Sequence, residues 1–132
     1  MMIKPDNCLT ELREVNELAK FNSWLGLKVV SASDGKAEVR VTWREEFGQY
    51  AGYLHAGLIA ALLDTACGFA VYTLSGKVLA SQFSMRSLRP TIAKTFVVTG
   101  HVIQPGKQQI FVAAELADLD TPDRIPASSM RL

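Results

Sequence analysis

The sequence has few of the residues that build metal sites and reactive-thiol sites. Its 132 residues include two cysteines, Cys8 and Cys67, and two histidines, His55 and His101, whose spacing matches no metal-binding motif. There is no Gly-x-Ser-x-Gly pattern, and Cys67 has no candidate base beside it, so nucleophilic catalysis by serine or cysteine is not indicated. We therefore expect neither a metal ion nor a cofactor.

An excess of charge of either sign is also absent. Fourteen lysines and arginines against thirteen aspartates and glutamates give a formal net charge of +1. Proteins that bind nucleic acid or anionic membranes usually carry a basic face, so we expect neither as a partner. No basic segment followed by an apolar stretch occurs near Met1, which predicts a cytoplasmic rather than a secreted protein.

One apolar run, residues 54–74, is long enough to cross a bilayer. Asp64 lies at its centre and is the only formally charged residue between Leu54 and Val71. Because a central charge is costly in a membrane, the run is better interpreted as a core helix. A lone carboxylate in a core is costly as well, unless it is paired, hydrogen-bonded or protonated. We expect Asp64 to be buried, and either functional or satisfied by a strand residue.

The order of the remaining patterns predicts one α+β domain over residues 1–132. An amphipathic helix is expected at 6–22, a hairpin around Asp34-Gly35 in 27–43, and the core helix at about 54–74. Strand-like runs follow at 78–89, 95–103, 108–118 and about 125–132. An antiparallel sheet of about five to six strands wrapped around the long helix buries these patterns most simply. Because its edge strands invite pairing, we expect a dimer.

The core helix carries two candidate catalytic features. Helical spacing groups small residues on one face around Asp64, which leaves room for a ligand or a partner helix. These residues are Gly57, Ala60, Ala61, Cys67 and Gly68. The helix begins near His55-Ala56-Gly57, where free backbone N–H groups favour an oxyanion. Ala56 and Asp64 are eight residues apart, or about 12 Å along one helix, so one carbonyl cannot touch both. If both serve one reaction, they must come from different subunits.

The two histidines are weaker candidates for a catalytic base. His55 is either a base or a residue whose ring binds backbone and fixes the turn before the helix, and the second role is favoured. His101 lies on a predicted strand without an acidic or nucleophilic neighbour in sequence, so a structural role is favoured there too.

The segment Gln49-Tyr50-Ala51-Gly52-Tyr53-Leu54-His55-Ala56-Gly57, followed by Leu62-Leu63-Asp64-Thr65-Ala66, resembles the hotdog-fold acyl-CoA thioesterases. The closest likeness is to their phenylacetate-degradation and 4-hydroxybenzoyl-CoA type, which has an asparagine, a loop, His-Gly-Gly and then a helix carrying an acid. The later segment 82–90, which ends in Leu-Arg-Pro, is similar to a strand of that family. The resemblance covers about residues 22–132.

The resemblance implies roles for the residues that match the motif. Asp64 would be the general base or nucleophile, and the backbone N–H of Ala56 or Gly57 in the other subunit would hold the oxyanion. Gln49, where asparagine is frequent, would position water or the carboxylate, and His55 would order the loop. Coenzyme A would be the leaving group, and dimers would often pair into tetramers.

The resemblance also implies substrate-binding residues on the strand after the long helix: Ser81, Phe83, Met85, Arg86 and Arg89. Arg86 and Arg89, with Lys94, would either meet the phosphates of coenzyme A or be solvated charges at a strand end. Phe83 and Met85 indicate an apolar pocket that a benzoyl ring or a medium aliphatic chain would fit equally well.

Two other functions remain as alternatives. The first is a non-catalytic acyl-CoA-binding module with the same fold, although binding alone gains nothing from a buried carboxylate. The second is an acyl-thioester hydratase or dehydratase. Those enzymes generally use a histidine with a second acid or an Asp-x-Asn-x-x-His loop, and neither pattern is present.

Overall fold

The computed structural model describes residues 5–76, 82–90, 92–121 and 128–131. Its elements are, in chain order, α1 (Pro5–Leu18), α2 (Lys20–Leu25), β1 (Lys28–Ser33), β2 (Lys36–Thr42), the 3-10 turns η1 (Glu45–Phe47) and η2 (Tyr50–Gly52), α3 (Ala56–Ser75), β3 (Ser84–Ser87), β4 (Thr95–Gln104), β5 (Phe111–Asp118) and β6 (Ser128–Arg131). The six strands form one sheet in the order β1-β2-β4-β5-β6-β3, and every neighbouring pair is antiparallel. The predicted α+β architecture is confirmed.

The first hairpin shows why the sequence turns where it does. Asp34 and Gly35 both have positive φ, 52° and 79°, as a two-residue turn of type I′ requires. The turn is tied to the end of α3, because the Gly35 N–H donates to Thr73 Oγ1 at 2.7 Å. The predicted hairpin is therefore confirmed, and it anchors the C-terminal end of the long helix.

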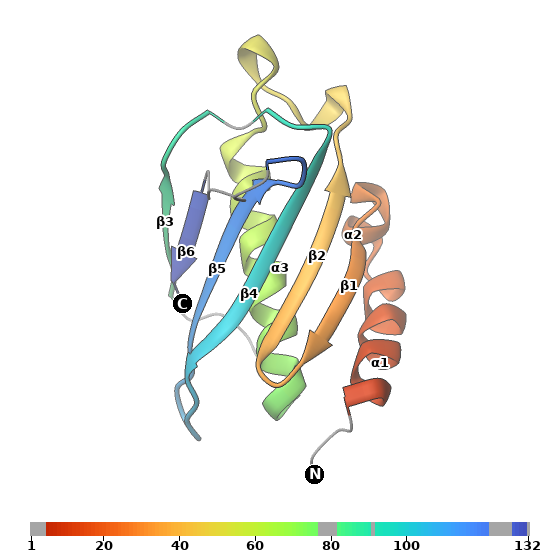
Figure 1. Cartoon of the computed structure of the whole chain (residues 1–132), viewed down its shortest axis with the longest axis vertical. Helices are drawn as coiled ribbons and strands as arrows, with labels where there is room; N and C mark the ends of the chain where they lie inside the picture. The colour runs from red at the N-terminus through yellow and green to blue at the C-terminus, as the bar shows by residue number, and fades with distance from the viewer. Residues whose placement is uncertain (1–4, 77–81, 91, 122–127, 132) are drawn as a thin grey trace.

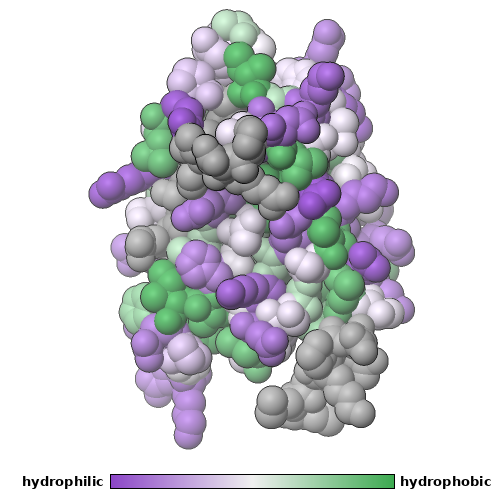
Figure 2. All heavy atoms as spheres, viewed as in Figure 1, coloured by the Kyte–Doolittle hydropathy of each residue, from purple (hydrophilic) through white to green (hydrophobic). Residues whose placement is uncertain are grey.

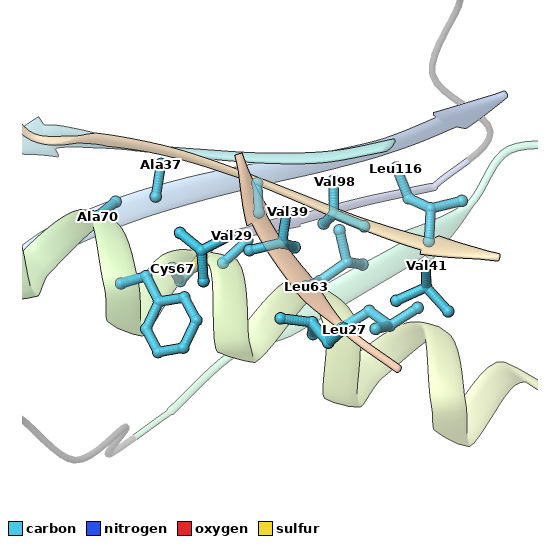
Figure 3. Close-up of a cluster of buried hydrophobic side chains, with 14 of the residues drawn as sticks. Leu27, Val29, Ala37, Val39, Val41, Leu63, Cys67, Ala70, Val98 and Leu116 are labelled. Atoms are coloured by element: carbon cyan, nitrogen blue, oxygen red, sulfur yellow. The ribbon is translucent and has the colours of Figure 1, made fainter. Parts of the chain in front are cut away.

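Helix α3 lies along one face of the sheet, behind the strands in Figure 1. Figure 3 shows its side chains Leu63, Cys67 and Ala70 directed at residues of β2, β4 and β5. Gly100 of β4 allows a close approach of α3 to the sheet, since a Cβ atom there would lie 2.4 Å from the backbone oxygen of Ala66. The helix is long and apolar enough to span a membrane by length and composition. Its packing against the sheet makes it the core helix of the fold.

The outer face of the sheet has a different character. In Figure 2, which has the same view as Figure 1, hydrophilic side chains are interspersed with small hydrophobic groups. Along β2, for example, the residues that face away from α3 alternate with the fully buried Val39 and Val41. The described core therefore lies between α3 and the inner face of the sheet.

The N-terminal region differs from the single helix predicted over 6–22. Ala19 has extended φ and ψ angles, −81° and 106°, and separates α1 from α2. Helix α1 buries Cys8 and Leu12 beside β1, and the Asn16 Nδ2 donates to the Leu27 carbonyl at 2.8 Å. The break turns Phe21 out of the buried face, and its side chain is 47% exposed.

The strand predicted over 78–89 is shorter in the structure. Strand β3 covers Ser84–Ser87 and pairs with β6 alone among the described strands, so it forms one edge of the sheet. Residues 77–81 lie outside the described part of the chain.

Candidate active site

The loop before α3 is held closed by its own backbone. Gly48 forms an isolated antiparallel bridge with Leu54. The Gln49 N–H donates to the Tyr53 carbonyl at 2.8 Å, and the His55 N–H donates to the Phe47 carbonyl at 2.9 Å. Phe47 is buried at 1% exposure and anchors the loop to the core. The start of α3 is therefore fixed by a short folded loop.

His55 is the N-cap of α3. Its Nδ1 accepts a hydrogen bond from the Gly57 N–H at 2.9 Å. An accepting Nδ1 carries no proton, so in the neutral ring the proton is on Nε2. This hydrogen bond is the geometric basis for the loop-ordering role predicted for His55. Because Nδ1 caps the helix, it is not available as a base.

The first turn of α3 leaves one candidate oxyanion donor. The N–H groups of Leu58 and Ile59 both donate to the His55 carbonyl at 3.0 Å. Gly57 donates to the His55 ring, so it is not available to an oxyanion. The Ala56 N–H has no acceptor among the described residues. Of the two N–H groups predicted to hold the oxyanion, those of Ala56 and Gly57, the Ala56 N–H is therefore the remaining candidate.

Asp64 lies two turns further along the same helix. The sequence predicted a buried carboxylate, but the side chain is exposed in the single chain. The reason is that the sheet covers only one face of α3, whereas Asp64 lies on the opposite face with the half-buried Ala60, Ala61 and Gly68. Cys67, which was grouped with this face, is instead fully buried.

The chemistry of this carboxylate is nevertheless perturbed. Desolvation raises the pKa of Asp64 above its ordinary value of 3.8. No hydrogen bond or ion pair of its side chain is formed within the described part of the chain. A structural partner on a neighbouring strand, the alternative considered from the sequence, is therefore not found among these residues. Within residues 5–76, 82–90, 92–121 and 128–131, Asp64 is a carboxylate with free oxygens on a face of α3 that no other element covers.

Two cavities flank the loop. The first, of about 370 Å³, is lined by Trp43, Glu45, Gly48, Gln49, Gly52, Ile92 and Ala93, and we call it the Gln49 cavity. The second, of about 330 Å³, is lined by Phe21, Glu46, Phe47, Gly48, His55, Gly57 and Leu58, and we call it the α2 cavity. Within one chain, Gln49 and His55 therefore face different cavities, and Asp64 lines neither of them.

An aromatic cluster beside the α2 cavity escaped the sequence analysis. Trp24 stacks on Phe21 with ring centroids 6.1 Å apart and meets Phe47 edge-on at 5.3 Å. The Arg44 guanidinium lies over Phe47, 4.4 Å from the ring centroid, and donates to the Trp24 carbonyl. The signal in the sequence is the Phe-x-x-Trp spacing of residues 21 and 24. Phe21 fell within the helix predicted at 6–22, and Trp24 lay outside it.

The predicted substrate-binding residues lie on and near β3. Met85 is half-buried against the core, whereas Phe83, Arg86 and Arg89 are exposed. None of these four residues lines either cavity. Ser81 lies outside the described residues. Among the described residues, no group of three or more metal-ligating side chains is found.

The long helix α3 packs along one face of an antiparallel sheet, and this arrangement is the hotdog fold. Comparison with known proteins agrees. The thioesterase superfamily matches residues 51–124. A protein of Saccharolobus solfataricus named "Putative esterase" is 28% identical over 122 residues, which cover 90% of this chain and 85% of that protein.

Two solved structures show the same fold. A thioesterase family protein from Silicibacter pomeroyi has a TM-score of 0.87 at 23% identity, covering 94% of this chain and 93% of that one. The E. coli PaaI protein from the phenylacetic acid degradation operon has a TM-score of 0.86 at 23% identity, covering 96% and 91%. This chain belongs to the thioesterase superfamily, and its reaction class is thioester hydrolysis.

Proposed function

We propose that this chain is a cytoplasmic acyl-CoA thioesterase of the phenylacetate-degradation and 4-hydroxybenzoyl-CoA type, with Asp64 as its catalytic carboxylate. The observation that carries the proposal is the state of Asp64. It is unpaired among the described residues, partly desolvated and set among small residues on a face of α3 that the described part of the chain leaves uncovered. A carboxylate with a raised pKa is a better general base than one with an ordinary pKa.

In the proposed reaction, Asp64 accepts a proton from water as the water oxygen attacks the thioester carbonyl carbon. The carbonyl oxygen becomes an oxyanion that the Ala56 N–H and the helix dipole stabilise. The C–S bond then breaks, and the proton held by Asp64 passes to the leaving thiolate. The products are the free acid and coenzyme A. In the covalent variant, Asp64 attacks the carbonyl carbon itself and the resulting anhydride is hydrolysed.

The proposed site is formed by two copies of the chain. Ala56 and Asp64 are about 12 Å apart along α3, so one thioester cannot contact both in one subunit. Two α3 helices running antiparallel would bring Asp64 of one copy to Ala56 of the other. The uncovered small-residue face of α3 and the edge position of β3 are consistent with such a dimer. We further propose that two such dimers pair into a tetramer, as the resemblance to the family implies.

The test is release of coenzyme A from a panel of acyl-CoAs, followed with a thiol-detecting dye. We expect release by the native protein and its loss in Asp64→Asn, which keeps the size of the side chain and removes the base. Asp120→Asn is the matched control, because Asp120 is exposed in the turn after β5 and should leave the rate unchanged. Tight binding of an acyl-CoA without thiol release would replace the proposal with the non-catalytic binder.

The hydratase alternative is examined with the same samples. An enoyl-CoA substrate would lose its conjugated absorbance without releasing a thiol if the protein were a hydratase. We expect no such change, because the described residues near α3 offer a capped histidine rather than a histidine free to act with a second acid.

A further inference from the structure

The α2 cavity meets the first turn of α3, where the proposed oxyanion donor lies. His55 and Gly57, the residues on either side of Ala56, both line it. A thioester whose carbonyl oxygen binds the Ala56 N–H therefore has the α2 cavity next to its carbonyl carbon. Gly48 lines this cavity and the Gln49 cavity as well, so the two hollows adjoin the same point of the loop.

The lining of the α2 cavity suits an apolar part of the substrate. It includes Phe21, Phe47 and Leu58, and its one formally charged residue, Glu46, is paired with Arg44 at 3.8 Å. Aromatic and aliphatic walls favour an apolar chain over a charged group. The Gln49 cavity also has one formally charged lining residue, Glu45, so charge does not distinguish the two cavities. The position of the α2 cavity beside Ala56 decides the assignment.

Phe21 forms a wall of the α2 cavity that comes from a separate element. It is the one residue of α2 that lines the cavity, and its ring is held by Trp24, which packs in turn on Phe47 and under Arg44. Because the ring is 47% exposed, its size can change without opening a hole in the core. A change in its size therefore changes the cavity and not the core.

We propose that the α2 cavity holds the acyl group of the substrate and that Phe21 sets its length, so that the substrates are coenzyme A thioesters of uncharged, apolar acids of limited size. This proposal rests on the proposed thioesterase function and deepens it, because it assigns a substrate class and a specificity-determining residue. Phe21 does not take part in the chemical step. Its replacement therefore changes the preference among substrates rather than the reaction.

The experiment measures kcat/KM for straight-chain acyl-CoAs of increasing length with the native chain, Phe21→Ala and Phe21→Trp. In the native chain, each methylene that enters the cavity should raise kcat/KM about fourfold, until the cavity is full. Phe21→Ala should move the optimum to longer chains and Phe21→Trp to shorter ones. Phe111→Ala is the matched control, because Phe111 is 51% exposed at the start of β5 and lines neither cavity. Its length profile should match that of the native chain.

A binding measurement separates the failure of this proposal from the failure of the proposed function. The probes are non-hydrolysable acyl-CoA ketone analogues of the same lengths, titrated by calorimetry against the same proteins. Hydrolysis with one length profile for all variants overturns the role of Phe21 and leaves the thioesterase in place. If no acyl-CoA is hydrolysed but the bound analogues show a length preference that Phe21→Ala shifts, the thioesterase function is overturned and the acyl pocket is supported. If neither hydrolysis nor a length preference is found, the thioesterase function and the role of Phe21 are both overturned.

Discussion

Replacing Ala56 with proline should remove the proposed oxyanion donor and leave the fold intact. Proline has no N–H, and at the first position of a helix it removes no intrahelical hydrogen bond. The residue before a proline must be extended, and His55 already has φ −61° and ψ 132°. The side chain of Ala56 is exposed, so the ring of proline has room. The change therefore removes one hydrogen-bond donor from the site.

The magnitude follows from the number of donors left at the start of α3. The N–H groups of Gly57, Leu58 and Ile59 are all engaged with His55, so they cannot replace that of Ala56. In a serine protease, which also transfers an acyl group, loss of a single oxyanion donor lowers kcat about 100- to 1,000-fold. We expect a loss of this size, with KM changed much less. Ala56→Gly keeps the N–H and is the matched control, and its kcat should stay near that of the native chain.

Mixing two inactive variants tests whether the site is shared between copies. In a heterodimer of Ala56→Pro and Asp64→Asn, one composite site has both Asp64 and the Ala56 N–H, and the other has neither. Random reassortment after denaturation and refolding makes half of the dimers mixed, so about a quarter of the native activity should return. If Ala56→Pro retains native kcat, the oxyanion assignment is wrong. If the mixture stays inactive, the two groups do not meet across a dimer.

Three other measurements follow from the structure. The raised pKa of Asp64 predicts that kcat/KM falls as pH drops through a midpoint above 3.8, because the base must be deprotonated; a midpoint at or below that value would contradict it. Gly100→Ala should lower the free energy of unfolding by about 3 kcal/mol or more in urea titration, since its Cβ would lie 2.4 Å from the Ala66 oxygen; a loss under about 1 kcal/mol would show that α3 moves freely. Cys8 and Cys67 are 1% and 0% exposed. Burial, and to a smaller extent the charge of Asp64, raises the pKa of Cys67 to about 12. A thiol reagent should therefore label neither cysteine until the protein is unfolded.

The arrangement of elements could be predicted because local signals agree with the global fold. Asp34-Gly35 supplies the two positive φ angles of the hairpin turn, and the long apolar run between Gly52 and Gly76 has the length of the core helix. Both signals are short-range, and neither depends on what the segment later packs against. Hydrophobic patterning of this kind is a more reliable guide to which helices and strands form than to which elements pack against each other.

The site was harder to predict because it depends on contacts that the sequence pattern does not contain. Small apolar residues surround Asp64 on the helix, which suggested burial, but an alanine-rich face looks the same in sequence whether the sheet covers it or not. The cap made by the His55 ring, which removes the Gly57 N–H from the site, depends on a rotamer. Phe21 fell within the single helix predicted at 6–22, and the break at Ala19 changed its direction.

The cap on α3 also links the choice of donor to the shape of the substrate pocket. The same imidazole that accepts the Gly57 N–H forms part of the wall of the α2 cavity. The His55 side chain therefore fixes the direction of the first turn of α3 and also limits the space next to the Ala56 N–H, which it leaves available. Replacing His55 should then lower kcat through the position of Ala56 and, at the same time, broaden the acyl-length profile. A residue that served only to stabilise the helix would change the melting temperature and leave the ratio of kcat/KM between long and short substrates as it is.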